Sequence, residues 1–310
     1  MADSAFPQGD SNACIAVFIT YKPGTDCARQ LEALAPQVAK ILVVDNGSDE
    51  ENCALLRSKV ESLGGEFIGL GDNYGIAAAQ NIGIRRAKEL GARYVLISDH
   101  DSIASPTMVS GLIEAANSDP LIAGAGPLPS ENREGADQLV YVARKWSPKR
   151  ARPEELAQPT LDVPFLIASG CLLKMEALDD IGLMNQSMFI DHVDLEWGLR
   201  ALKAGWRLIA VPSKHLEHSL GDEVVQLPGR AQPVHVHSPI RNYYILRNTL
   251  HMVRSGLMPP KWRIRYTWWA MKYMAFNGLL ADRLPDRRKM MWHALKDGYR
   301  HRLGKIGKDT

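Results

Sequence analysis

Two aspartates stand two residues apart at the end of a short apolar run, in the sequence YVLISDHD, as Asp99 and Asp101. In an extended turn both carboxylates can face one cation, and hard divalent ions such as Mg²⁺ and Mn²⁺ prefer such oxygen ligands. An isolated pair of this kind is more often a solvated loop. The preceding strand and the motifs described below favour a metal site, in which Mg²⁺ or Mn²⁺ would also bind the phosphates of a substrate.

A second acidic group surrounds the expected start of a helix in the sequence FIDHVDLEW, residues 189–197. Asp191 and Asp194 are three residues apart, so they share a face if both lie in the first turn. The helix dipole also favours acidic residues at a helix N-terminus, so simple capping is an equal alternative to catalysis. Further along the chain, His215 and His218 lie three apart in an expected loop, and either could complete a metal site.

Glycines precede another expected helix in the sequence GDNYGIAAAQNIGI, residues 71–84. Glycine ahead of a helix N-terminus lets backbone N–H groups approach a phosphate. The spacing matches neither the GxGxxG fingerprint nor a Walker loop, which needs Gly-Lys-Ser/Thr. On its own this segment predicts only a turn.

Apolar, β-rich runs alternate with helical spacing through the N-terminal third of the chain, which predicts a parallel α/β sheet with helices on both faces. The expected strands cover residues 15–21, 41–44, 66–70 and 94–98. In such a sheet, ligands bind beyond the carboxyl ends of the strands. Tyr21, Asp45 and Asp99 each follow an apolar run directly, so we expect them along one edge of the sheet.

The composition is that of a globular protein, because 45% of the 310 residues are apolar and 23% are charged. Four scattered cysteines form no CxxC pair, which disfavours a zinc ribbon and suits a reducing compartment. The N-terminus lacks the basic start and apolar run of a secretion signal, and no apolar stretch reaches the length of about 18 residues that spans a membrane. We therefore expect a cytoplasmic protein.

The charge is uneven, since residues 241–310 hold 16 Lys and Arg against 4 Asp and Glu while the rest of the chain is acidic. Within this segment aromatic residues recur at helical spacing, among them Trp262, Tyr266, Trp269 and Tyr273. Basic aromatic helices suit a membrane surface, on which they lie without crossing it. The same stripe would suit packing against the catalytic part or against a second subunit of a homo-oligomer. A nucleic-acid-binding protein is the alternative from a different class, but it leaves the carboxylates unexplained.

The order of these motifs resembles that of the inverting family 2 glycosyltransferases, which have the GT-A fold. The segments that carry the resemblance are ITY (19–21), VVDNGS (43–48), GDNYGIAAAQNIGI (71–84), DHD (99–101) and FIDHVDLEWGLRA (189–201). Three features narrow it to the bacterial rhamnosyltransferases of O-antigen and cell-wall polysaccharide assembly. These are FIDHVDLEW, HSLGD (218–222) and HSPIRNYYILRN (237–248).

The resemblance implies an α/β fold of the GT-A type that serves nucleotide-diphospho-sugar transferases, with a mostly parallel central sheet flanked by helices and followed by C-terminal amphipathic helices. We expect a catalytic domain at residues 1–255, with a donor-binding half at about 14–125 and an acceptor half at about 126–255, and a basic aromatic helical segment at 256–310. The donor would be dTDP-β-L-rhamnose, and the acceptor a saccharide or lipid-linked saccharide of lipopolysaccharide synthesis. Another nucleotide sugar, such as a UDP-hexose, is the alternative donor. The enzyme would lie on the inner face of the cytoplasmic membrane.

The resemblance also implies roles for individual residues. The donor nucleotide would be bound by Thr20, Tyr21, Asp45, Asn46, Asn73, Gly75, Asn81 and Asp99, with Asp45 on the edge of the base. The metal would be held by Asp99, Asp101 and His218. Many relatives carry Glu-Asp where this chain has Asp191-His192, and we expect Asp191 to be the catalytic base, with Asp194 holding the helix start or orienting the acceptor. The base would take the proton of the acceptor hydroxyl in a single displacement, which converts a β-linked donor into an α-linked product.

Overall fold

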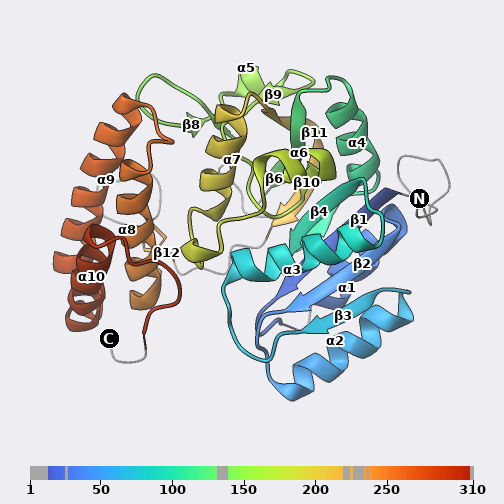
Figure 1. Ribbon diagram of the computed structural model, residues 1–310, viewed down its shortest axis with the longest axis horizontal. Coiled ribbons are helices and arrows are strands. Elements are labelled where there is room, and N and C mark those ends of the chain that lie inside the picture. The colour runs from blue at the N-terminus through green and yellow to red at the C-terminus, as the bar shows by residue number, and fades with distance from the viewer. Residues whose placement is uncertain are drawn as a thin grey trace.

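The protein is represented by a computed structural model that describes residues 13–24, 27–130, 139–218, 224–225, 234–235 and 237–307. One mixed sheet has the strand order β3-β2-β1-β4-β10-β6-β11-β5, with β9 paired to β11 (Figure 1). Its strands are β1 (Cys14–Thr20), β2 (Lys40–Asp45), β3 (Glu66–Gly69), β4 (Tyr94–Asp99), β5 (Ser102–Ala104), β6 (Ile122–Ser130), β9 (Leu161–Asp162), β10 (Cys171–Lys174) and β11 (Arg207–His218). Two short pairs lie outside it, β7 (Tyr141–Val142) with β8 (Lys149–Arg150), and β12 (Val224–Val225) with β13 (Val234–His235).

The first four strands of the sheet are parallel, as the alternation of strands and helices predicts. Strand β10 is antiparallel to both of its neighbours, whereas β6 and β11 are parallel to each other. The register pairs Thr20 with Asp45 and Ile19 with Asp99. The carboxyl ends of β1, β2 and β4 therefore lie at one edge of the sheet, and this confirms the expected α/β class.

Side chains of β1 alternate between two apolar layers, as the two-residue period of a strand requires. Ile15, Val17 and Ile19 join the layer that contains helices α3, α6 and α7. Cys14, Ala16 and Phe18 join the layer that contains α1, α2 and α4. The helices are α1 (Cys27–Leu34), α2 (Glu50–Ser62), α3 (Ile76–Glu89), α4 (Met108–Asn117), α5 (Pro153–Leu156), α6 (Met175–Ile181), α7 (Val193–Lys203), α8 (Pro239–Arg254), α9 (Pro260–Leu279) and α10 (Leu284–Tyr299).

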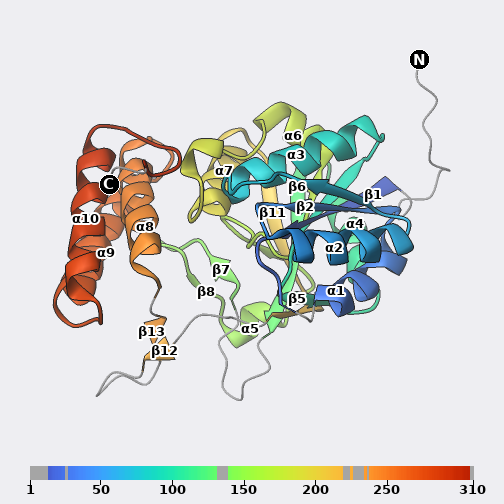
Figure 2. The same cartoon turned by 90° about the horizontal axis from the view of Figure 1, so that it is seen from below.

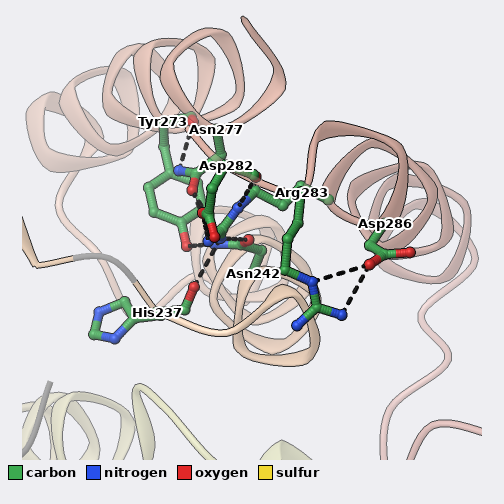
Figure 3. Close-up of polar contacts among 8 residues, drawn as sticks. His237, Asn242, Tyr273, Asn277, Asp282, Arg283 and Asp286 are labelled. Carbon is green, nitrogen blue, oxygen red and sulfur yellow. Dashed lines mark hydrogen bonds and ion pairs between the residues drawn. The ribbon is translucent and has the colours of Figure 1, made fainter. Parts of the chain in front are cut away.

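Helices α8, α9 and α10 pack together beside the sheet (Figures 1 and 2). Their polar centre is the buried guanidinium of Arg287, which donates to the carbonyl of His237 at 2.7 Å, to Oδ1 of Asn242 at 2.6 Å and to the Asp282 carboxylate at 2.6 Å. Asn242 in turn donates to the hydroxyl of Tyr273 (Figure 3). A buried charge whose partners are removed costs about 3–5 kcal/mol, so this network fixes how the three helices meet.

The expected aromatic stripe of α9 is buried at its first position and partly exposed further along, with Trp269 more exposed than Tyr266 and Tyr273. Trp262 is only 4% exposed, and its indole N–H donates to the carbonyl of Arg144 at 2.8 Å. A different row, Ile264, Trp268 and Met271, is the exposed apolar face of α9, with Ile264 at 62% exposure. Among the described helices, none is both long enough and apolar enough to cross a bilayer.

Candidate active site

A cavity of about 470 Å³ opens at the carboxyl ends of β1 and β4. Its wall combines both groups of acids that the sequence singles out, because Asp99 and Asp101 face it from the end of β4, and Asp191 and Asp194 face it from the start of α7. Arg241 of α8 supplies a cation to the same wall. Other expected site residues in the lining are Tyr21, Asn46, Asn73 and Gly75. Several carboxylates around one cavity produce a negative potential that attracts cations.

Thr20 and Asp45 lie beneath this wall and are fully buried. Both carboxylate oxygens of Asp45 accept hydrogen bonds, from the Thr20 hydroxyl at 2.8 Å, from the Ser48 hydroxyl and N–H, and from the N–H of Gly47. Burial by itself raises the pKa of Asp45, but these bonds outweigh it and hold the pKa below its ordinary value. Asp45 therefore orders the turn after β2, and its expected contact with the nucleotide base stays a prediction.

The turn before α3 is connected to the turn after β2 through two asparagines. Asn46 donates to Oδ1 of Asn73 at 3.1 Å and accepts the N–H of Tyr74 at 2.9 Å, while Asn73 also accepts the N–H of Gly75. Gly75 has a φ of +90°, and a Cβ at this position would lie 2.6 Å from the carbonyl oxygen of Phe189. Glycine is therefore required here because the backbone of the acidic loop passes so close.

Asn81 lies deeper, on α3, and is almost fully buried. It donates to the carbonyl of Met184 at 2.8 Å and accepts the N–H of Met184 at 2.9 Å. It does not border the cavity in this structure but fixes the segment that leads into the acidic loop. Its expected contact with the nucleotide remains a prediction.

Asp99 at the end of β4 and Asp101 just beyond it offer oxygen ligands of the kind that divalent metals bind. Oδ2 of Asp99 accepts the hydroxyl of Ser169 at 2.7 Å, and Oδ1 of Asp101 accepts that of Ser102 at 3.2 Å. The part of the chain that the structure describes holds no cluster of three or more His, Cys, Asp or Glu residues placed to bind a metal unaided. Two carboxylates are ligands of the kind that Mg²⁺ and Mn²⁺ accept, with substrate phosphates and water completing the coordination.

The histidine proposed as a further ligand belongs to a strand, so the loop expected at His215 and His218 is wrong. β11 continues to His218 because it pairs there with β5, and the register places His218 opposite Ser102, directly after Asp101. The side chain of His218 lies outside the described residues. Its role as a ligand remains a prediction.

The loop that carries the second acid pair has an unusual backbone. Phe189, Asp191 and His192 have φ values of +66°, +64° and +63°. Non-glycine residues in this left-handed region cost about 1–3 kcal/mol each, and they persist only where surrounding contacts hold them. The loop therefore needs strong external support.

Helix α8 provides that support. The side-chain amide of Asn248, which is fully buried, donates to the carbonyls of Met188, Ile190 and Asp191 at 2.8–2.9 Å. The buried guanidinium of Arg247 donates to the carbonyl of Met188 at 2.9 Å and to the carbonyl of Gly304. Helix α8 thus shapes the acidic loop directly.

The two acids of the loop have different surroundings. Asp191 forms an ion pair with Arg241, at 2.6 Å between Oδ1 and Nη2, and its side chain is 12% exposed. Asp194 accepts the N–H of Leu195 and stands among other carboxylates. Burial, followed by the charges of Asp191 and Asp99, raises the pKa of Asp194 to about 6. Asp194 can therefore exchange a proton near neutral pH.

His192 sits between these acids in sequence, at the position just before α7. Its Nε2 lies 2.8 Å from the hydroxyl of Thr249 on α8. Burial lowers the pKa of His192 below its ordinary value, although the charge of Asp191 opposes this. The ring is therefore neutral at physiological pH and is held by α8.

Three residues of α8 that the sequence reasoning did not assign to the site are Arg241, Arg247 and Asn248. All three lie in the HSPIRNYYILRN segment, which carries the family resemblance. Their partners are 50 to 60 residues away in sequence, so only the spatial arrangement reveals their roles. The sequence signal that pointed to these three residues was the resemblance carried by this segment, in which polar residues recur between apolar ones.

A sheet of this topology, with acids from the end of β4 and from the start of α7 around one cavity, defines a nucleotide-sugar transferase of the GT-A type. Residues 17–182 match the family model for glycosyl transferase family 2. The chain belongs to this family.

Two relatives narrow the resemblance. The dTDP-rhamnosyl transferase RfbF of Shigella flexneri is 30% identical over 260 residues, which cover 79% of this chain and 81% of that protein. The N-acetylglucosaminyl-diphospho-decaprenol L-rhamnosyltransferase of Mycobacterium tuberculosis is 24% identical over 301 residues, covering 88% and 94%. The resemblance to family 2 rhamnosyltransferases of cell-surface polysaccharide synthesis is therefore confirmed.

Solved structures share the fold. GalNAc-T7 with UDP, GalNAc and Mn²⁺ superimposes with a TM-score of 0.59 at 16% identity, over 86% of this chain and 57% of that one. The mannosyltransferase PcManGT of Pyrobaculum calidifontis, in complex with GDP-Man and Mn²⁺, gives 0.55 at 16% identity, over 95% of this chain and 83% of that one. At these identities the comparison supports the GT-A-like fold alone.

Proposed function

We propose that the protein transfers L-rhamnose from dTDP-β-L-rhamnose to a saccharide or lipid-linked saccharide during the synthesis of a cell-surface polysaccharide. The observation that carries this proposal is the convergence of Asp99 and Asp101 with Asp191 and Asp194 on one cavity. The 30% identity to a dTDP-rhamnosyl transferase supports the choice of donor. The acceptor of the mycobacterial relative, an N-acetylglucosaminyl diphospholipid by its name, supports the lipid-linked class.

A divalent cation, Mg²⁺ or Mn²⁺, fits the Asp99 and Asp101 side of the cavity. When bound, it would neutralise charge on the departing diphosphate. Structural neighbours that contain Mn²⁺ support this assignment. On the protein side, Ser169 holds the carboxylate of Asp99 in place through its 2.7 Å hydrogen bond.

For the catalytic base we propose Asp194, whereas the sequence alone favours Asp191. Asp191 is already engaged in an ion pair with Arg241, at 2.6 Å between Oδ1 and Nη2. Asp194 has a pKa of about 6, close to the value at which a carboxylate is both ionised and basic at neutral pH. Asp194 would accept the hydroxyl proton of the acceptor, and Asp191 with Arg241 would fix the loop and the donor side. Attack opposite the departing dTDP would invert the β-linked donor to an α-linked product.

We also propose that the enzyme rests on an anionic membrane through the outer face of α9. Ile264, Trp268 and Met271 form an exposed apolar row, and Arg263 and Lys272 flank it. Apolar and aromatic side chains beside cations are the combination that binds an anionic bilayer surface. A lipid-linked acceptor would be embedded in the same surface, so membrane binding would bring the enzyme to its acceptor.

The experiment that tests the donor is calorimetric titration with dTDP-β-L-rhamnose, UDP-glucose and GDP-mannose, each with and without Mn²⁺. We expect the dTDP sugar to bind most tightly, and Mn²⁺ to strengthen its binding. Tightest binding of UDP-glucose would favour the alternative donor class. Equal or absent binding of all three would contradict the proposed function.

A further inference from the structure

A second cavity, of about 420 Å³, adjoins the loop that carries the acid pair. Helix α9, the start of α7 and the stretch between β7 and β9 surround it. Its lining includes Tyr141, Ser147, Phe165, Arg265, Tyr266 and Trp269. His192 and Asp194 line both this cavity and the first, so these two residues form the boundary between the two spaces.

The walls of the second cavity are aromatic. Tyr141 stacks on Phe165 with ring centroids 5.5 Å apart, and Trp269 stacks on Tyr273 at 4.9 Å. Aromatic faces carry partial negative charge, which suits the weakly positive C–H faces of a sugar ring. A mostly apolar pocket with a few polar groups is the usual form of a site for a small molecule.

A small number of polar groups complete the lining. Ser147 and Tyr266 bring hydroxyls, and Arg265 is an exposed cation at the rim. Burial raises the pKa of Tyr266 to about 12, so its phenol keeps its proton and can donate a hydrogen bond. A guanidinium is well suited to bind a phosphate.

The second cavity borders Asp194, and this position indicates which ligand the cavity would hold. In a single displacement, the acceptor hydroxyl must contact the base and attack from the side opposite the leaving group. A ligand in the second cavity can reach Asp194 without entering the first cavity, where the acids suited to a metal and a diphosphate lie. A ligand in each cavity would therefore meet at Asp194.

From this arrangement we infer that the second cavity is the acceptor subsite, and that it binds a sugar ring against the aromatic wall that includes Tyr266 and Trp269, with an attached phosphate at Arg265. This inference rests on the proposed function and adds to it the place and the chemical class of the acceptor. The hydroxyl proton passes to Asp194 as the hydroxyl oxygen forms its bond to the anomeric carbon, and the bond from that carbon to the dTDP oxygen breaks. The C-terminal helix α9 thereby becomes part of the active site.

The test uses the full-length protein with dTDP-β-L-rhamnose as donor and two water-soluble probes, an N-acetylglucosaminyl-diphospho-alkyl and the corresponding N-acetylglucosaminyl alkyl glycoside. Trp269→Ala should raise the acceptor KM of both probes about tenfold or more, because stacking is lost, while the donor Kd by calorimetry stays unchanged. Arg265→Gln should raise the KM of the diphosphate probe alone. Trp292→Ala is the matched control, since this tryptophan of α10 is 67% exposed and lines neither cavity.

Ser147→Trp provides a second variant, which keeps the aromatic walls and fills the cavity from the loop side. It should raise the acceptor KM with the donor Kd and the melting temperature preserved. Acceptor KM values for Trp269→Ala and Ser147→Trp equal to that of Trp292→Ala would overturn the subsite. Failure of the wild-type protein to use the diphosphate probe, despite tight donor binding, would overturn the acceptor class. Loss of donor binding by the wild-type protein would instead contradict the proposed function itself.

Discussion

Replacing Asp194 by Asn is the perturbation with the sharpest expected result. The change keeps the shape of the side chain and removes its basicity. A positioned general base contributes about 10²–10⁴-fold to a rate, so kcat should fall by about that factor. Donor affinity, measured by calorimetry with dTDP-β-L-rhamnose, should change little. The assay is the release of dTDP in the presence of the diphosphate acceptor probe.

The pH dependence gives a second readout of the same residue. With a pKa of about 6, Asp194 is ionised for about nine tenths of molecules at pH 7 and about one tenth at pH 5. The base works only when ionised, so wild-type kcat/KM should fall about tenfold from pH 7 to pH 5. The residual activity of Asp194→Asn should lack this acidic limb.

Asp194→Asn should raise the stability of the fold while it lowers the activity. The pKa of Asp194 in the folded state lies above its ordinary value of 3.8. Its stabilising contribution is therefore complete below about pH 4 and is lost as pH rises through about 6. At pH 7 the ionised, buried carboxylate disfavours folding by of order 1–3 kcal/mol, and Asp194→Asn should melt at a higher temperature than the wild type.

Asp191→Asn is the comparison that decides between the two acids. It breaks the ion pair with Arg241, and we expect a smaller loss of kcat with the acidic limb retained. Near-normal kcat in Asp194→Asn together with a collapse in Asp191→Asn would refute the reasoning and return the role of base to Asp191.

Three other changes test the remaining parts of the site. Asp101→Asn should remove the dependence of turnover on Mn²⁺ and lower kcat about 10²-fold, as a titration of activity against Mn²⁺ will measure. Asn248→Ala leaves buried carbonyls of the acidic loop without a donor, so urea unfolding should show a loss of about 2–3 kcal/mol, and kcat should fall more than donor affinity. Ile264→Asp should weaken binding to phosphatidylglycerol vesicles about tenfold or more in a flotation assay, whereas Leu55→Asp, at an exposed position of α2, should not.

For each of these three substitutions, one result would contradict the role proposed for the residue. Wild-type turnover with full Mn²⁺ dependence in Asp101→Asn would exclude Asp101 as a ligand. Unchanged unfolding free energy and kcat in Asn248→Ala would show that the loop holds its conformation without α8. Equal vesicle binding by Ile264→Asp and Leu55→Asp would exclude the outer face of α9 as the membrane contact.

The parallel part of the sheet, from β1 to β4, can be predicted because its signals are local. Each apolar run such as residues 94–98 is followed at once by its polar group, here Asp99, and a parallel sheet brings such positions to one edge. The antiparallel insertion of β10 could not be read, because four buried residues carry no periodicity that distinguishes strand direction.

The support of the acidic loop could not be predicted for a related reason. Asn248 bonds carbonyls that lie 57 to 60 residues away, and the choice of those carbonyls depends on how α8 packs. The helical stripe of α9 was visible in sequence, but its orientation was not, because the rotation that buries Trp262 and exposes Ile264 is set by contacts with α8 and with Arg144. Periodicity identifies a face of a helix, and tertiary packing decides what covers it.

The most direct test of the central claim is the product formed from dTDP-β-L-rhamnose and the N-acetylglucosaminyl-diphospho-alkyl probe with Mn²⁺ present. Nuclear magnetic resonance of the purified product reports both the transferred sugar and its anomeric configuration. The account predicts stoichiometric release of dTDP and a single α-linked rhamnosyl product. A β-linked product would contradict single displacement, and transfer from UDP-glucose with none from dTDP-β-L-rhamnose would contradict the rhamnosyltransferase assignment.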